Sequence, residues 1–191
     1  MAAPNSQLRE PHLCEIFMTW LVFRVFGRSV YRDFAGSLPL TGKETVLDFG
    51  CGMGTVAYFV AERLPEVKLT CVDISERWLV ACKRTLKNYQ NVSFLRGDIA
   101  LLPLTDLSFD IIYSHFVLHD IEDSELKRVV PVLARLMKEK GKFIFREPMK
   151  DMEKIRFIQS LMEGSNLCRE SSRITDIPAM GNALENVYKK V

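Results

Sequence analysis

The sequence predicts an α/β fold in which helices cover both faces of a doubly wound, mostly parallel sheet. From Thr45 onward, short apolar runs alternate with amphipathic stretches, which is the pattern of strands alternating with helices. The expected strands are almost wholly apolar, as strands buried on both faces are. At 191 residues, with 48% hydrophobic and 26% charged residues, the chain has the size and composition of one globular domain.

A helical lead-in precedes the first strand. One apolar helix is expected within Pro11–Phe26 and a shorter helix near Ser29–Ala35. The first helix is shorter than the roughly 20 apolar residues that span a bilayer, and it carries Glu15 and Arg24. We therefore expect no transmembrane segment and a helix that packs on the domain as an N-terminal cap. An interfacial membrane helix is the alternative.

Five strands and the helices between them follow in order. The strands are expected at Thr45–Phe49, Lys68–Val72, Val92–Leu95, Asp110–Ser114 and Lys142–Phe145. Apolar residues at helical spacing predict one helix over Thr55–Leu64. A second helix should run from Ser75, as its N-cap, to about Tyr89.

A third helix is expected between the fourth and fifth strands. Asp123 or Ser124 can cap its start, and Gly141 fits its C-terminal cap. Pro131 lies inside it and should kink or split it, because the proline ring clashes with the preceding turn.

The C-terminal part reads less regularly. A helix is expected over Ile155–Met162, ended by Gly164. Weak alternation predicts two final strands, Cys168–Arg173 and Ala183–Lys189, which would complete a seven-stranded sheet.

Composition narrows the class of protein. The 26 basic and 24 acidic residues leave a net charge of +2, which gives no basis for a nucleic-acid partner. The odd number of cysteines and the absence of C-x-x-C spacing predict neither a metal site nor a disulfide framework. Free thiols and an N-terminus without a signal-peptide pattern favour a cytoplasmic location. The five cysteines are Cys14, Cys51, Cys71, Cys82 and Cys168.

The most informative segment is a glycine run directly after the first strand. Gly50, Gly52 and Gly54 stand at alternate positions, so a ligand can lie against bare backbone at the start of a helix. Asp48 precedes them at the strand end and suits a cationic group on that ligand. A dinucleotide fingerprint needs a glycine three residues after Gly52, where this chain has Thr55. The spacing therefore disfavours a nicotinamide enzyme.

Acids and polar residues also follow the other expected strands. Asp73 lies 23 residues beyond Gly50, a distance at which a carboxylate can accept bonds from a ribose diol. Asp98 follows a glycine after the third strand, and Ser114 and His115 end the fourth. Each alone is a common turn or cap residue. In order, at successive strand ends, they indicate one extended ligand site.

On these motifs the chain resembles the class I S-adenosylmethionine-dependent methyltransferases, whose fold is Rossmann-like. The motifs are Val46-Leu47-Asp48-Phe49-Gly50-Cys51-Gly52-Met53-Gly54, Cys71-Val72-Asp73-Ile74-Ser75, Arg96-Gly97-Asp98-Ile99 and Ser108-Phe109-Asp110-Ile111-Ile112-Tyr113-Ser114. The resemblance implies a single methyltransferase domain over residues 1–191. Its parts would be a helical cap (1–40), a cofactor-binding core (45–148) and a C-terminal helix with the last strands (149–191).

The resemblance also implies S-adenosylmethionine as the cofactor and assigns the residues that hold it. The methionine portion would be held by Asp48, Gly50, Cys51, Gly52 and Gly54. The backbone carbonyl of Ser114 or His115 would receive the methionine ammonium group.

The resemblance assigns the adenosine portion of the cofactor to the second and third of these motifs. Asp73 would bind the ribose hydroxyls, with Ile74 packed on the adenine. Asp98 would accept from the adenine amino group, and the Ile99 backbone N–H would face a ring nitrogen.

A general base is needed only if the methyl acceptor must lose a proton. His115, His119 and Glu147 follow the fourth and fifth strands and are the candidates. A local packing role is the stronger expectation for His119 and Glu147, and Cys51 is expected to be a small filler rather than a nucleophile.

The expected function is methyl transfer to a small molecule. A protein or RNA methyltransferase is one alternative, although the near-neutral charge speaks against an unaided RNA binder. A non-catalytic cofactor-binding partner subunit is another. The apolar N-terminal helix could also join copies of the chain into an oligomer.

Overall fold

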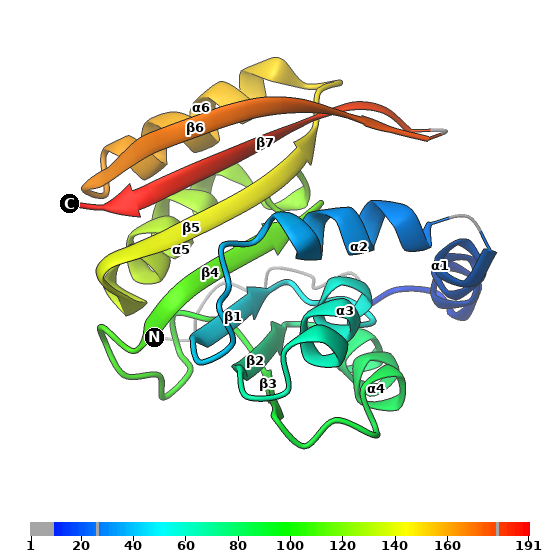
Figure 1. Ribbon diagram of the computed structural model, residues 1–191. Helices are drawn as coiled ribbons and strands as arrows, with labels where there is room; N and C mark the ends of the chain where they lie inside the picture. The colour runs from blue at the N-terminus through cyan, green and yellow to red at the C-terminus, as the bar shows by residue number, and fades with distance from the viewer. Residues whose placement is uncertain (1–9, 26, 179) are drawn as a thin grey trace, which may run out of the picture.

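The computed structural model describes residues 10–25, 27–178 and 180–191; Phe26, at the end of the predicted lead-in helix, lies outside them. These residues form one seven-stranded sheet with helices on both faces, which confirms the predicted fold (Figure 1). Its strands are β1 (Thr45–Phe49), β2 (Lys68–Asp73), β3 (Val92–Arg96), β4 (Phe109–His115), β5 (Met137–Pro148), β6 (Leu167–Ile177) and β7 (Gly181–Lys190).

Two helices precede β1, and the others lie between the later strands, except that β3 leads to β4 and β6 to β7 without a helix among the described residues. The helices are α1 (Leu13–Val25), α2 (Arg28–Ser37), α3 (Thr55–Arg63), α4 (Glu76–Thr85), the 3-10 turn η1 (Leu118–Asp120), α5 (Asp123–Leu136) and α6 (Met152–Glu163). Ser75 caps α4, because its Oγ accepts from Trp78 N, and Gly164 ends α6, as predicted.

The strand order is β3-β2-β1-β4-β5-β7-β6. β1 pairs in parallel with β2 on one side and with β4 on the other. The strands β2 and β3 are therefore added on one side of β1 and the later strands on the other, so the strand order reverses at β1. β7 enters antiparallel between β5 and β6. The carboxyl ends of β1 to β5 therefore share one edge, and ligands of such sheets bind where the order reverses.

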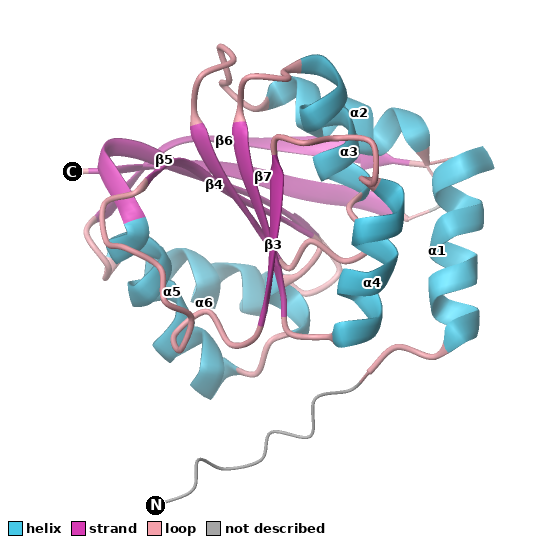
Figure 2. Ribbon diagram, turned by 90° about the horizontal axis from the view of Figure 1, so that it is seen from below, coloured by secondary structure: helices cyan, strands magenta, loops and turns pink. Residues whose placement is uncertain are grey.

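Alternate residues of β1 belong to two hydrophobic cores, one on each face of the sheet. Val46 packs with residues of α2, α3 and α4, whereas Leu47 packs with residues of α5 and α6. Both side chains are fully buried. Figure 2 shows these two groups of helices on opposite faces of the sheet. Burial on both faces explains why the strands read as continuous apolar runs.

The start and the middle of α5 differ from prediction. The capping position is Glu122, which has no side-chain cap bond, and Asp123 already belongs to the helix; neither it nor Ser124 is the cap. Pro131 lies inside one continuous helix, so a split helix is wrong. Leu133 and the other apolar residues of this helix are buried against the sheet, and that packing outweighs the bond that proline cannot donate.

Gly141 does not cap α5 either. The chain passes directly from α5 into β5, which begins at Met137 rather than at the predicted Lys142, and Gly141 lies within the strand. A Cβ at Gly141 would stand 2.8 Å from the carbonyl oxygen of Lys138 and 3.1 Å from that of Asp110. This glycine therefore permits a close approach of backbones.

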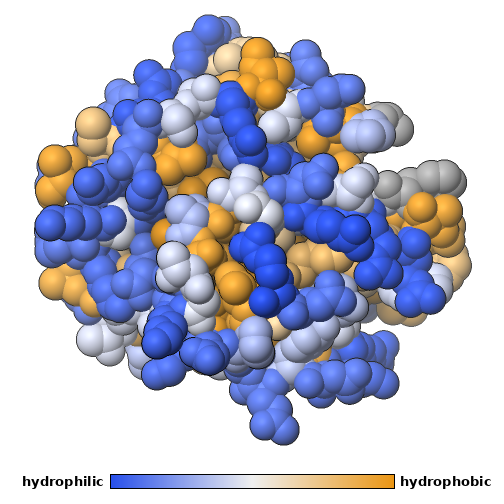
Figure 3. Space-filling model, in the orientation of Figure 1, coloured by the Kyte–Doolittle hydropathy of each residue, from blue (hydrophilic) through white to orange (hydrophobic). Residues whose placement is uncertain are grey.

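Helix α1 contradicts the expectation that it packs closely on the domain. Phe23 is its one buried residue, and its ring lies 5.9 Å, centroid to centroid, from each of Tyr31, Tyr58 and Phe59. Figure 3 shows hydrophobic side chains gathered over this helix at the right of the molecule. The exposed large hydrophobic residues of α1 are Leu13, Phe17, Met18, Trp20, Val22 and Val25.

Among the residues that the structure describes, no helix has both the length and the apolar character that crossing a membrane requires.

Candidate functional site

The candidate site lies where the parallel strands end and the strand order reverses. After β1, Gly50, Gly52 and Gly54 have φ angles of 74°, 52° and 78°, which favour glycine. Gly50 N and Cys51 N both donate to the carbonyl oxygen of Val72 in β2, at 2.9 and 3.0 Å. The glycine spacing seen in the sequence thus reflects a turn with a left-handed backbone, fixed to the neighbouring strand. We call residues 50–54 the glycine turn.

Gly52 is the open position of the glycine turn. A Cβ at Gly52 would meet no atom within 4 Å, whereas a Cβ at Gly50 would stand 2.5 Å from Val117. Val117 belongs to the segment after β4, so that segment closes one side of the turn. Space for a ligand against the backbone therefore lies at Gly52.

Asp73, at the end of β2, is bonded to the glycine turn. Its Oδ2 accepts from Gly52 N and its Oδ1 from Ser75 N, both at 2.9 Å. Burial raises the pKa of Asp73, although these two backbone donors oppose the rise. The neighbouring Ile74 side chain is 42% exposed, so it offers an apolar surface beside the carboxylate.

Asp48 is enclosed, in contrast to Gly52. Its side chain is 3% exposed. Burial raises the pKa of Asp48 well above its ordinary value, and the nearby Cys82 and Asp73 raise it further. On the adjacent strand Ser114 is also fully buried, and its Oγ has no hydrogen-bond partner among the described residues. A buried acid and an unpaired hydroxyl thus lie in the two strands that flank the reversal of the sheet.

His115, at the end of β4, is surrounded by aromatic rings. Its ring centroid lies 4.1 Å from Phe116, 4.7 Å from Phe34 and 5.5 Å from Tyr31. Burial, assisted by the charge of Arg146, lowers the pKa of His115 well below its usual value. Its Nε2 has no partner within the described part of the chain. His115 is therefore a neutral ring in an aromatic wall.

The backbone turns sharply after β4. Phe116 has a φ of 60°, a left-handed conformation that a bulky residue keeps only when its surroundings hold it there. Its N–H donates to the carbonyl oxygen of Arg146 at 2.9 Å. Glu147, fully buried at the end of β5, accepts from Val117 N at 3.1 Å and Leu118 N at 2.8 Å. Strand β5 therefore positions the segment that closes the glycine turn.

Glu147 also holds the ring of His119. His119 Nδ1 lies 2.5 Å from Glu147 Oε2, and its Nε2 lies 3.4 Å from Asp120 Oδ1. The hydrogen bond to Glu147 raises the pKa of His119, and the His119 side chain is 19% exposed. His119 thus combines a local contact with Asp120 and a contact with Glu147, which lies 28 residues away in the sequence. Two candidate bases thus form one pair in which Glu147 orients His119.

Asp98 and Ile99 lie on the loop after β3. Asp98 Oδ2 accepts from Arg128 Nη2 of α5 at 2.6 Å, and its Oδ1 accepts from Ala100 N at 3.0 Å. Partial burial is the largest single influence on the pKa of Asp98 and acts to raise it, but the bonds from Arg128 and from Ala100 N, together with the charge of Arg128, lower it overall. Ile99 has a buried side chain. Asp98 therefore has an ion-pair partner on a helix that the sequence pattern did not connect with it.

Sequence reasoning missed Glu10 at the rim of the site. Glu10 Oε2 accepts from Ser75 Oγ at 2.6 Å, and its Oε1 accepts from Glu76 N at 3.0 Å. The Ser75 bond lowers the pKa of Glu10. Arg77 Nη1 donates to the carbonyl oxygen of Pro11 at 2.9 Å. These bonds tie the lead-in to the start of α4, beside Asp73. The only sequence feature that could have predicted this contact is an acidic residue, which interacts favourably with the N-terminus of a helix.

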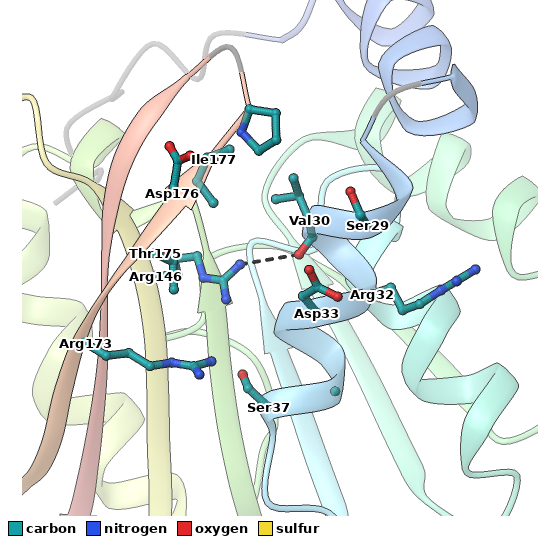
Figure 4. A pocket seen from close by; sticks show the side chains of 12 residues that line it. Ser29, Val30, Arg32, Asp33, Ser37, Arg146, Arg173, Thr175, Asp176 and Ile177 are labelled. Atoms are coloured by element: carbon teal, nitrogen blue, oxygen red, sulfur yellow. Dashed lines mark hydrogen bonds between the residues drawn. The ribbon is translucent and has the colours of Figure 1, made fainter.

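A groove of about 740 Å³ lies between α2 and the β6–β7 hairpin (Figure 4). Arg146 and Arg173 line it, and the Nη2 of each lies 2.7 Å from the carboxylate of Glu185, which is 4% exposed. No residue of the glycine turn lines the groove. Phe34 contacts both Arg146 and His115, so it stands between the groove and the aromatic wall.

Comparison with known proteins adds an independent line of evidence. A family model described as "Methyltransferase domain" matches residues 46–141. The demethylmenaquinone methyltransferase of Thermotoga maritima is 33% identical over 104 residues, covering 54% of this chain and 43% of that protein. The tRNA N(3)-methylcytidine methyltransferase of Schizosaccharomyces pombe is 29% identical over 122 residues, covering 61% and 48%. The matches span less than half the length of either relative.

Solved structures share the fold. The S-adenosylmethionine-dependent methyltransferase of Methanosarcina mazei has a TM-score of 0.67 to this chain at 14% identity, covering 80% of this chain and 94% of that one.

Proposed function

This chain belongs to the methyltransferase domain family, in the class I S-adenosylmethionine-dependent group, and from that premise we propose that it transfers a methyl group from S-adenosylmethionine to a small-molecule acceptor. The geometry of the glycine turn is the observation that carries the proposal. The turn is open at Gly52, the Gly52 N–H is bonded to Asp73, and the buried acid Asp48 precedes the turn.

The residues around the glycine turn fit the methionine portion of the cofactor. Gly52 leaves bare backbone against which that portion can lie. Asp48, with the carbonyl oxygen of Ser114 or His115, would receive the ammonium group, and the unpaired Ser114 Oγ is a further polar atom on that side. When bound, the cofactor supplies a methyl group already activated on a positively charged sulfur.

The next strand ends fit the adenosine portion. Each oxygen of Asp73 accepts one backbone bond and retains capacity for a ribose hydroxyl. The exposed Ile74 side chain would pack on the adenine. Asp98 would accept from the adenine amino group only by sharing its carboxylate with Arg128, while Ile99 offers a backbone N–H.

We assign His119 as the base for acceptors that must lose a proton. Glu147 binds Nδ1 of His119 and so directs Nε2 as the atom that can take a proton. The same carboxylate holds Val117, which lies against the glycine turn. Glu147 is then a positioning residue, because backbone donors and the imidazole already engage it. We assign His115 to the wall of the site rather than to the base, because its ring lies among those of Phe116, Phe34 and Tyr31 and its Nε2 is buried.

The acceptor class follows from charge and surface. A net charge of +2 does not provide the dense positive surface that RNA binding uses. The aromatic wall of Tyr31, Phe34, His115 and Phe116 suits a small acceptor with apolar parts. Three buried cysteines without a disulfide suit the reducing cytoplasm that we propose as its location.

One alternative has an observation in its favour. The exposed apolar side chains of α1 would suit a partner protein or a second copy of the chain, as in a non-catalytic cofactor-binding subunit. The relative from Schizosaccharomyces pombe is named for methylation of tRNA, which keeps an RNA acceptor among the outcomes to be tested.

Two experiments separate these functions. Calorimetric titration with S-adenosylhomocysteine should give one site per chain, and no binding at millimolar ligand would contradict the proposal. Incubation with methyl-labelled cofactor and cell extract should then place the label in small molecules. Label in protein or RNA would support those acceptors instead, and cofactor binding without any transfer would support the non-catalytic subunit.

A further inference from the structure

Three cysteines that are scattered in the sequence meet beneath the glycine turn. Cys51 belongs to the turn itself, Cys71 to β2 and Cys82 to α4. Their Sγ atoms all lie within 4.8 Å of one another. Their spacing in the sequence does not predict the cluster, because each cysteine lies in a different element of the fold. None of the three thiols is assigned a chemical step in the proposed methyl transfer, although Cys51 belongs to the turn that would hold the methionine portion of the cofactor.

The cluster is enclosed by the protein. Cys71 and Cys82 are fully buried and Cys51 is 7% exposed. A Cβ at Gly54 would stand 2.8 Å from Cys82 Sγ, so the glycine turn lies directly over that sulfur. The three thiols therefore converge at an enclosed position in which one more atom could be shared among them.

We propose that Cys51, Cys71 and Cys82 form a three-thiolate binding site for a soft d10 metal ion. The geometry is near that of such a site. A zinc–sulfur bond of about 2.3 Å corresponds to sulfur separations of about 3.8 to 4.0 Å in tetrahedral or trigonal arrangements, and a larger ion needs larger separations. The observed separations of up to 4.8 Å need to contract by less than about 1 Å to meet those values.

The donor set selects the kind of ion. Thiolates favour soft cations, whereas carboxylate and carbonyl oxygens favour magnesium and calcium. Zn²⁺ in closed structural sites takes four ligands, and the cluster has three. We therefore expect Cd²⁺ or another soft d10 ion to bind more tightly than Zn²⁺. Binding of M²⁺ needs all three sulfurs as thiolates, so each cysteine that is still a thiol releases its proton, and the filled site carries a net charge of −1.

The ion would join the elements that carry the cofactor site. It would cross-link the glycine turn, β2 and α4, which also hold Gly52, Asp73 and Ser75. A ligand that binds only the folded state raises its stability by mass action, so melting should shift upward as the metal concentration rises.

The test uses a full-length chain in which the two exposed cysteines are removed, Cys14→Ser with Cys168→Ser. This protein should bind one Cd²⁺ per chain under reducing conditions, with a thiolate-to-cadmium charge-transfer absorption and an upward melting shift. Cys71→Ala in the same background should weaken binding by at least 100-fold. Equal Cd²⁺ affinity with and without Cys71, or no charge-transfer absorption, would overturn the proposal.

A second measurement does not depend on a core substitution. X-ray absorption of the Cd²⁺-loaded Cys14→Ser, Cys168→Ser protein should show three sulfur neighbours. One or two sulfurs, or mainly oxygen neighbours, would reject the three-thiolate site even if Cys71→Ala failed to fold. Binding of S-adenosylhomocysteine, measured separately in the metal-free protein, shows that the fold is intact.

Discussion

The cofactor edge of this molecule and its N-terminal cap are built by different means. At the cofactor edge, backbone groups are fixed by short bonds, such as those from Gly52 N to Asp73 and from Gly50 N to Val72. In the cap, α1 is held mainly by the one buried side chain of Phe23 and exposes six large hydrophobic residues. The glycine turn is thus fixed by hydrogen bonds, whereas the cap has a surface that can still bury area against another molecule.

The bounds of the family match follow the same division. The family match ends at residue 141 and starts at 46, so it leaves out the cap and the β6–β7 hairpin. The parts that would choose the acceptor therefore lie outside the parts that identify the donor.

The largest effect is expected at Asp73. Asp73→Ala should remove two charge-assisted bonds to the ribose, each worth roughly 1.5–3 kcal/mol, and weaken S-adenosylhomocysteine binding by about 100-fold or more. Asp106→Ala is the matched control, because Asp106 pairs with Arg135 on the exposed surface at 2.9 Å. Similar dissociation constants for the two variants, measured by calorimetry, would show that the cofactor edge is wrongly assigned. Thermal melting must accompany the titration, since Asp73 also anchors Gly52 and Ser75.

The cap should respond unevenly to substitution. Phe23→Ala should lower the free energy of unfolding by about 3 kcal/mol, as for other buried phenylalanines. Phe17→Ala, on the same helix but 58% exposed, should change it by no more than about 0.5 kcal/mol. Urea denaturation of both variants measures the difference. Equal losses would mean that the exposed face of α1 is covered in solution, for example by a second copy.

A smaller effect is expected at Asp48, with a dependence on pH. The free protein holds Asp48 with a raised pKa, and an ammonium partner lowers that pKa, so binding releases a proton and affinity rises with pH. The titratable groups that interact with it are Cys71, Cys82, Tyr113 and Asp73. Calorimetry in buffers of different ionisation enthalpy should detect the proton.

Asp48→Asn should abolish that proton release and cost roughly 1.5–3 kcal/mol of binding. Unchanged proton release in this variant would place the ammonium group elsewhere.

The smallest effect concerns His119 and stability. The folded-state pKa of His119 is raised by Glu147, so the pair stabilises the fold at pH values below the unfolded pKa of about 6.5. That contribution is lost as pH rises through the folded-state pKa. His119→Gln should therefore flatten the fall in urea midpoint between about pH 6 and pH 8.5. Parallel curves for wild type and variant would show that the pair does not stabilise the fold.

The sequence predicted the sheet and the glycine turn because both depend on local patterns. Glycines with positive φ at alternate positions, and acidic residues at the ends of buried strands, can be recognised from a few neighbouring residues of the sequence, as at Gly52 and Asp73. The extent of β5 and the continuity of α5 through Pro131 were not predictable, because burial against the sheet overrides local propensity there.

Contacts between distant elements were also beyond the sequence. The pairing of His119 with Glu147 spans 28 residues, and the cysteine cluster draws one thiol from each of three elements. The packing of α1 was mispredicted for a related reason. Its apolar composition indicated burial, but no neighbouring element covers most of its surface in the part of the chain that the structure describes.

The central claim, that the cofactor lies on the glycine turn, is tested most directly by calorimetry of Gly52→Asn against wild type with S-adenosylhomocysteine. Asparagine tolerates the left-handed backbone at φ 52°, and its side chain would point into the open space at Gly52, so the variant should fold. The account predicts one site per chain for wild type and loss of binding in Gly52→Asn at an unchanged melting temperature. Equal binding by the two proteins would contradict it.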